Sequence, residues 1–167
     1  SITVSPYMGS DSVEPFLSLD NKYVFLLALT SNIGSQDFQE LILADNSEKL
    51  YEKVISKSKN WKNNERIMYV VGAKNTQEIA KIRSLVPDSY LLIPGVGAQG
   101  GNLKEICNYG LDKNFKIIVN SSRSIIYASS DDDFASMARN EAKKIQCEMA
   151  IYIVFFLLHF LPFMTSH

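Results

Sequence analysis

The sequence predicts an α/β fold built from five consecutive β/α units. Five short apolar runs, rich in β-branched and aromatic residues, recur at residues 2–4, 23–29, 67–71, 90–93 and 115–119. Most of these runs are unbroken, which is typical of strands that are buried on both faces of a parallel sheet. Their starts lie about 20 to 45 residues apart, which leaves room for a helix in each right-handed crossover.

Helical patterns fill the segments between these runs. We expect helices at residues 35–56, 76–85 and 103–109, and a last helix that begins behind residues 131–133. The third helix precedes Gly110, a residue type that commonly follows a helix end. The three aspartates at 131–133 suit the positive end of the last helix, which we expect to end near Met149.

Two architectures are compatible with this order of elements. One is a complete five-stranded doubly wound sheet of flavodoxin-like topology. The other is the last five units of an eight-unit (β/α) barrel. The pattern of elements does not distinguish them.

Charge and composition argue against several functional classes. The 167 residues include 17 Lys and Arg against 18 Asp and Glu, so neither a strongly basic nucleic-acid binder nor an acidic tail is predicted. Cys107 and Cys147 have no zinc-site spacing, and we expect two buried thiols in a reducing, cytoplasmic compartment. Because His159 and His167 lie at the very end, neither a histidine base nor a metal site is expected.

A glycine-rich loop follows the fourth predicted strand. Residues 94–101 contain four glycines, which allow close backbone approach and leave amides free to bind a phosphate. Residues 95–100 also match the G-x-G-x-x-G dinucleotide pattern, but that pattern belongs at the first βα turn and requires an acidic residue at the end of the next strand. The next strand is followed instead by Asn120. A purely structural tight turn is the alternative.

Two further loops have polar groups at strand ends. Arg123 lies among serines just after the fifth strand, where it can grip a phosphate in a bidentate manner; alone, it would be an ordinary surface arginine. In (β/α) barrels the loops after the last two strands often hold a phosphate, so the glycine-rich loop and Arg123 predict a shared phosphate site. Residues 29–34, after the second strand, could face a ligand, or Ser31 or Ser35 could merely cap the following helix.

Five segments together resemble one enzyme family. Residues 3–16, 29–35, 70–73, 93–101 and 119–129 are similar to the fourth to eighth strands, with their loops, of orotidine 5′-phosphate decarboxylases of the longer bacterial subgroup. The resemblance extends to about residue 150. It implies that residues 1–149 form the C-terminal five units of a (β/α)8 barrel without its N-terminal units, and that residues 150–167 are an apolar extension.

The resemblance also implies roles for individual residues. Arg123 would bind the 5′-phosphate of the substrate, with help from the backbone around Gly100, Gly101 and Ser122. Gln99 would reach the phosphate from a loop that closes over the ligand. Ser31 would hydrogen-bond the pyrimidine edge and meet Gln99.

The implied reaction is the loss of CO₂ from orotidine monophosphate to give UMP, in a homodimer that uses no metal or organic cofactor and binds no nucleic acid. The family's catalytic Lys and its Asp-x-Lys-x-x-Asp array belong to the second and third strands, so no catalytic residue is assigned here and the chain alone is expected to be inactive. Lys74 stands where the family usually has Thr. The alternative function is a non-catalytic phosphate- or nucleotide-binding module.

An apolar stretch near the C-terminus has no counterpart in the family. Residues 149–164 are almost entirely apolar, but 16 residues are fewer than the roughly 20 that a membrane span requires. The stretch could be a membrane anchor, a helix that docks on the barrel or a partner, or out-of-frame sequence. We favour the last interpretation, so membrane association is not expected.

Overall fold

The computed structural model describes residues 1–44, 47–74, 76–97 and 101–159. Five strands form one sheet in which every neighbouring pair is parallel. They are β1 (Ile2–Val4), β2 (Val24–Leu29), β3 (Ile67–Val71), β4 (Leu91–Pro94) and β5 (Ile117–Asn120). All five predicted strands are therefore confirmed, with boundaries that differ by at most two residues.

The order of the strands distinguishes the two architectures. The strands are adjacent in chain order, β1-β2-β3-β4-β5, as in a (β/α) barrel. A flavodoxin-like sheet would have the order 2-1-3-4-5, with helices on both faces. The doubly wound alternative is therefore wrong.

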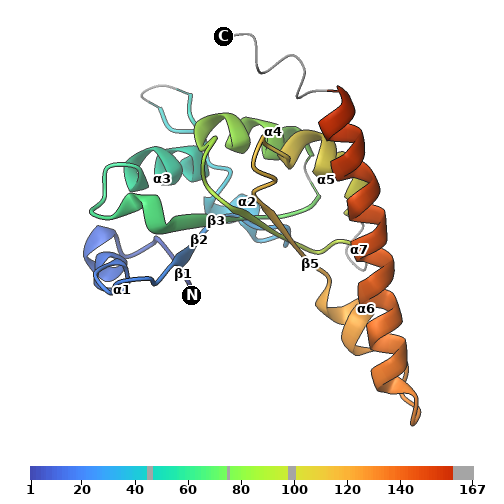
Figure 1. Cartoon of the computed structure of the whole chain (residues 1–167). Helices are drawn as coiled ribbons and strands as arrows, with labels where there is room; N and C mark the ends of the chain where they lie inside the picture. The colour runs from blue at the N-terminus through green and yellow to red at the C-terminus, as the bar shows by residue number, and fades with distance from the viewer. Residues whose placement is uncertain (45–46, 75, 98–100, 160–167) are drawn as a thin grey trace.

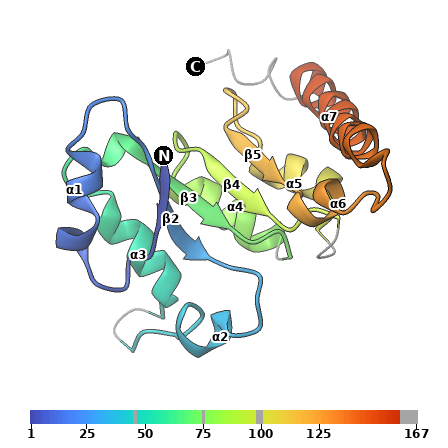
Figure 2. The ribbon, with the colours of Figure 1, turned by 90° about the horizontal axis from the view of Figure 1, so that it is seen from below.

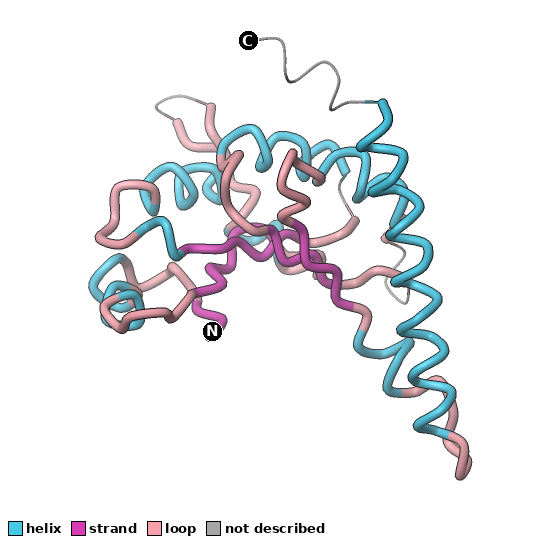
Figure 3. The backbone as a smooth tube through the Cα atoms, viewed as in Figure 1, coloured by secondary structure: helices cyan, strands magenta, loops and turns pink. Residues whose placement is uncertain are grey.

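Helices cover one face of the sheet. Figures 1 and 3 show α3 (Leu50–Ser58), α4 (Thr76–Leu85) and α5 (Leu103–Gly110) in a layer above the strands. In Figure 2, which looks at the opposite face, the strands lie in front of these helices. The long helix α7 (Phe134–His159) packs against α5 and the short α6 (Ser122–Ile126). The remaining helical elements are α1 (Glu14–Leu17), α2 (Ser35–Phe38) and 3-10 turns at Ser10–Ser12 and Asn64–Arg66.

Alternation along the strands separates a buried face from an uncovered one. Leu26, Tyr69 and Ile93 point toward the helix layer and are buried in the core with Ile79 and Ile106 of α4 and α5. The intervening residues face the other way, where no described helix lies. They include Phe25, Leu27, Met68, Leu92 and Ile118, which are half-buried or exposed, whereas Val70 on the same face is buried. Phe25 pairs with Met68, and Leu92 pairs with Ile118, so they form a continuous apolar surface across the sheet.

The single helix expected at residues 35–56 is wrong. The chain forms α2 and α3 instead, with a bridge between Ile42 and Lys49 in the segment that joins them. Leu50 donates its amide to the Leu41 carbonyl, 2.9 Å away, and so occupies an acceptor that a continuous helix would use. Ser47 has a φ of 59°, a left-handed conformation that interrupts a helix. The apolar spacing suggested one amphipathic face, but Ile42 is 70% exposed.

Two smaller expectations also fail. Gly110 is the last residue of helix α5, and the extended Leu111 follows it, so Gly110 is not the residue after the helix. A Cβ on Gly110 would lie 3.3 Å from side-chain atoms of Ile79 and Ile117. Cys107 is buried as expected, but Cys147 is exposed.

The last helix does not end near Met149. Helix α7 begins at Phe134, directly behind the aspartates as predicted, and continues to His159. Tyr152, Ile153 and Phe156 pack against the core, and the Phe156 ring meets the edge of Phe115 at a centroid distance of 6.1 Å. Part of the apolar stretch therefore packs on the chain itself. Within the described ranges, no helix combines the length and apolar character that crossing a membrane requires.

Arg83 stabilises the end of the sheet at which the strands begin. It is 9% exposed, and its guanidinium donates to five carbonyl oxygens, of which the nearest are those of Ser89 at 2.7 Å, Gly110 at 2.9 Å and Lys116 at 2.9 Å. These nearest carbonyls lie at the end of α5 and just before β4 and β5. Burial lowers the pKa of Arg83, but the group remains charged.

We expect Arg83→Met to lower the free energy of unfolding by about 3 kcal/mol, because hydrogen bonds to a charged group are lost and buried carbonyls are left without a donor. Urea unfolding followed by circular dichroism measures the effect. Arg139→Met, which changes an exposed residue of α7, is the matched control and should change stability by less than about 0.5 kcal/mol. Equal stability of the two variants would contradict the assignment.

Candidate functional site

The ends of four strands converge on one hollow. Because the strands are parallel, their carboxyl ends share one edge of the sheet. A hollow of about 600 Å³ opens there, a size typical of small-molecule sites. It is lined by Thr30, Ser31, Asn32, Ile33, Lys74, Pro94 and Arg123. The loops after β2 and β5, predicted separately from the sequence, therefore border the same space.

The β4 and β5 ends form a smaller polar recess. It measures about 110 Å³ and is lined by Pro94, Gly95, Val96, Asn120, Ser121, Ser122 and Arg123. The buried Ser121 hydroxyl donates to the Val96 carbonyl at 2.8 Å, which ties the two loops together. Ser122 donates to the side chain of Asn120 at 2.7 Å. No acidic side chain within the described ranges forms an ion pair with Arg123, so its guanidinium is available for an anion.

The glycine-rich loop needs its glycines at two positions. Gly95 has a φ of 95°, a conformation that other residues rarely adopt. At Gly101 a Cβ would lie 2.5 Å from the Cβ of Ala73, because Gly101 forms a bridge with Val96 directly against the end of β3. The loop is therefore held close to the neighbouring strand. Gln99 and Gly100 lie outside the described residues.

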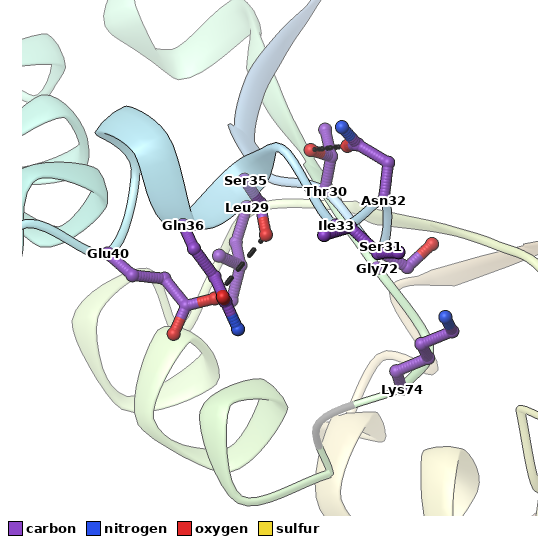
Figure 4. A pocket seen from close by; sticks show the side chains of 10 residues that line it. All are labelled: Leu29, Thr30, Ser31, Asn32, Ile33, Ser35, Gln36, Glu40, Gly72 and Lys74. Atoms are coloured by element: carbon purple, nitrogen blue, oxygen red, sulfur yellow. Dashed lines mark hydrogen bonds between the residues drawn. The ribbon is translucent and has the colours of Figure 1, made fainter.

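The loop after β2 forms the other side of the hollow. A pocket of about 200 Å³ lies here, lined by residues that Figure 4 draws as sticks. The Thr30 hydroxyl donates to Asn32 at 2.6 Å, and the Ser35 hydroxyl donates to Glu40 at 3.3 Å. The residue that precedes α2 is Gly34, so neither Ser31 nor Ser35 caps this helix. The capping alternative for these serines is therefore wrong.

Gly72 sets the position of Ser31. Its amide donates to the Leu29 carbonyl at 2.7 Å, and a Cβ on Gly72 would lie 2.6 Å from the Ser31 amide nitrogen and 2.8 Å from the Ser31 Cβ. Such distances are shorter than real contacts permit. The end of β3 is therefore pressed against the backbone that presents Ser31. Gly72 had no role among the residues expected in the site, although its place beside a strand end was a usable signal.

An ionic cluster lies where α4 meets the start of α3. Lys49 Nζ lies 2.7 Å from Glu78 Oε1, and the buried Tyr51 hydroxyl also donates to the Glu78 carboxylate. Burial opposes ionisation of Glu78, but the hydrogen bonds from Lys49 and Tyr51 outweigh it and hold its pKa below the ordinary value. The same hydrogen bond raises the pKa of Lys49. The cluster joins α4 to the start of α3.

The family model described as orotidine 5′-phosphate decarboxylase / HUMPS matches residues 1–138. The chain belongs to this family. The orotidine 5′-phosphate decarboxylases of Flavobacterium johnsoniae and Bacteroides fragilis are 56% and 55% identical to it over 150 residues. Each alignment covers 90% of this chain and 54% of the relative, so the chain spans about half the length of these curated relatives.

Solved structures of the decarboxylase family agree with the fold. The structure of Leishmania donovani OMP decarboxylase superposes with a TM-score of 0.71 at 35% identity, covering 87% of this chain and 55% of that one. Leishmania donovani UMP synthase gives a TM-score of 0.73 at 38% identity, covering 86% of this chain and 32% of that one. The chain thus holds five consecutive units of the family's (β/α)8 barrel.

The structure describes four of the six residues that the sequence analysis selected for this decarboxylase-family site. Ser31 and Arg123 line the large hollow, Ser122 and Arg123 line the recess, and Gly101 anchors the glycine-rich loop. Lys74 and Gly72, which were not selected, also line the pocket beside Ser31. In Figure 4 the Lys74 side chain extends toward the side of the pocket where Ser31 lies.

We expect Gly72→Ala to displace Ser31 and to lower the free energy of unfolding by about 1 to 3 kcal/mol, because the new methyl group would lie less than 3 Å from backbone atoms of Thr30 and Ser31 and from the Ser31 Cβ. Gly34→Ala is the control: Gly34 has a φ of −66°, and a Cβ there would meet only the movable side chains of Asn32, at 3.3 Å, and Asp37, at 3.6 Å. It should be neutral or stabilising. Urea unfolding and the amide chemical shift of Ser31 measure both effects. A destabilised Gly34→Ala with an unchanged Gly72→Ala would contradict this account.

The low pKa of Glu78 predicts a specific acid sensitivity. A carboxylate with a lowered pKa in the folded chain stabilises it above the ordinary value near 4.5, and this stabilisation is lost as the pH falls below that value. Between pH 5 and 3, the free energy of unfolding should fall less steeply in Glu78→Gln than in the parent chain, by at most about 1.4 kcal/mol per pH unit. Urea titrations at each pH measure the slopes, with exposed Glu105→Gln as control. Parallel curves for parent and Glu78→Gln would refute the prediction.

Proposed function

We propose that this chain is the phosphate- and pyrimidine-binding part of an orotidine 5′-phosphate decarboxylase, which converts orotidine monophosphate to UMP and CO₂. The five strands would be strands four to eight of the barrel. The observation that carries the proposal is the shared hollow at the strand ends, which Arg123 borders on one side and Ser31 on the other. We infer the reaction from membership of the family, and we infer the binding place of the substrate from the position of the hollow.

Arg123 binds the 5′-phosphate in this proposal. Its planar guanidinium can donate two parallel hydrogen bonds to phosphate oxygens, and the recess beside it is lined by backbone and hydroxyl groups. Amides near Gly101 and Ser122 supply further donors. We assign Gln99 and Gly100 to the same substrate-binding set on the basis of the family resemblance.

Ser31 binds the pyrimidine edge. Strands β2 and β5 are three strand spacings apart, about 14 Å measured along the sheet. A phosphate ion alone cannot reach both loops, whereas a mononucleotide is long enough to place its phosphate at Arg123 and its base at Ser31. The geometry therefore favours an extended ligand with one anionic end.

The chemical step belongs to residues that this chain does not carry. In the reaction, the bond between C6 and the carboxyl group breaks, CO₂ leaves, and C6 takes a proton. The described residues hold the ligand at both ends, and binding energy from the remote phosphate can be used to stabilise the transition state. We place the Lys and Asp residues that act at C6 on the earlier barrel units, in a cytoplasmic homodimer.

Removal of the Arg123 guanidinium should weaken nucleotide binding. We expect Arg123→Ala to lower the affinity for UMP, measured by calorimetry on the 167-residue chain, by about tenfold to a hundredfold, because charge-assisted hydrogen bonds to phosphate are lost. Inorganic phosphate should be affected in the same way. Arg139→Ala, on the exposed side of α7, is the control and should bind as the parent does. Equal UMP affinity in all three proteins would exclude the proposed phosphate site.

Activity should require the earlier barrel units. We expect no conversion of orotidine monophosphate by the 167-residue chain, because β1 and β5 each lack a neighbouring strand on one side and no helix among the described residues covers one face of the sheet. A fusion that places the first three β/α units of the Flavobacterium johnsoniae relative before Ser1 should produce UMP, as followed by the loss of substrate absorbance. A folded fusion without activity would overturn the proposed function. Turnover by the short chain would overturn the assignment of the chemical step.

A further inference from the structure

Gln39 links the loop that carries Ser31 to the helix layer. Its side-chain Oε1 accepts a hydrogen bond from the Thr30 amide at 2.7 Å, and its Nε2 donates to the Thr30 hydroxyl at 2.9 Å. The amide and the hydroxyl of Thr30 are thus both held by one side chain nine residues further along the chain. Thr30 directly precedes Ser31.

The backbone of Gln39 is fixed as firmly as its side chain. Its amide donates to the Ser35 carbonyl at 2.8 Å, and its carbonyl accepts from the Tyr51 amide, in the first turn of α3, at 2.9 Å. Tyr51 is buried and bound to Glu78, so this turn is itself anchored to α4. Gln39 therefore connects a rigid part of the helix layer to Thr30.

Two restraints act on Ser31 from different sides. Gly72 limits how far the Ser31 backbone can move toward β3. The two backbones are so close that a Cβ added to Gly72 would lie 2.6 Å from the Ser31 amide nitrogen. Gln39 holds the preceding residue from α2 and α3. Neither residue touches the recess beside Arg123.

We propose that Gln39 is a positioning residue for the base end of the ligand. Its side-chain amide fixes Thr30, and Thr30 orients Ser31 toward the hollow. The inference rests on the proposed function, because it takes the ligand to be a nucleoside monophosphate with its base at Ser31. Gln39 itself lines neither of the hollows that contain Ser31. Its effect is transmitted through Thr30 and is confined to the base.

An effect on the base alone would distinguish a positioning role for Gln39 from a general contribution to the stability of the fold. A residue that merely stabilises the chain would weaken the binding of every ligand to a similar extent. A residue that orients Ser31 should affect a ligand with a base and leave a phosphate ion, bound at Arg123, unaffected. UMP and inorganic phosphate are therefore the two probes.

The principal variant is Gln39→Met, which keeps the length of the side chain and removes both hydrogen-bonding groups. By calorimetry on the 167-residue chain, we expect UMP affinity to fall about tenfold and phosphate affinity to change less than twofold. Gln39→Glu keeps an oxygen that can accept from the Thr30 amide and should recover UMP affinity to within about threefold of the parent. Gln77→Ala, an exposed amide on α4 outside both hollows, is the control and should change neither affinity.

A second variant tests the same link if Gln39→Met does not fold. Thr30→Val removes the hydroxyl contact and keeps the backbone hydrogen bond, so a smaller loss of UMP affinity, about threefold, is expected with phosphate binding unchanged. Equal losses for UMP and phosphate, or no loss of UMP affinity, would overturn the positioning role while leaving the proposed function intact. If the parent chain binds phosphate but not UMP, the assignment of the base end fails. If it binds neither, the proposed function fails.

Discussion

The structure depends on one constraint: five strands run in the same direction and are adjacent in chain order. Every strand therefore begins at one edge of the sheet and ends at the other. The two edges differ in chemistry. At the first edge the buried Arg83 binds carbonyl groups and holds the helix ends against the strands. At the second edge the loops after β2 and β5 present hydroxyls and the Arg123 guanidinium, which has no acidic partner among the described residues, to a common hollow. Stability and ligand binding are thus located at opposite ends of the same strands.

The two sides of the hollow are built differently. The β2 side is supported by many contacts, since Gly72 abuts Ser31 and Gln39 ties Thr30 to the anchored start of α3. On the Arg123 side, among the described residues, the Ser121 hydroxyl bridges the loops after β4 and β5, and the binding group itself is a long side chain. A fixed surface suits recognition of a planar base, in which small displacements break hydrogen bonds. A charged group on a long side chain suits a phosphate, because its attraction depends less on exact geometry.

Much of the fold and part of the site could be predicted from the sequence. Most of the strands are unbroken apolar runs, and this local signal located the sheet, although among the described residues only one of its faces is covered by helices. The position of Arg123 after a buried strand placed it at the ligand edge, because parallel strands end together. The helix expected at residues 35–56 failed because Leu50 and Tyr51 donate to the carbonyls of Leu41 and Gln39, a contact between separate helices that periodicity does not encode. Gln39 and Gly72 escaped notice for the same reason: their importance comes from neighbours that only folding brings near.

The uncovered face of the sheet has a calorimetric consequence. Phe25, Met68, Leu92 and Ile118 remain partly in contact with water, because no described helix lies over them. The heat capacity increment of unfolding is governed by the apolar area that becomes hydrated, about 12 to 15 cal/mol/K per residue in fully packed domains. The chain should fall below that range, with a flatter dependence of stability on temperature than its length would suggest. If another segment covered this face, the heat capacity increment of unfolding would rise and the free energy of unfolding would depend more steeply on temperature.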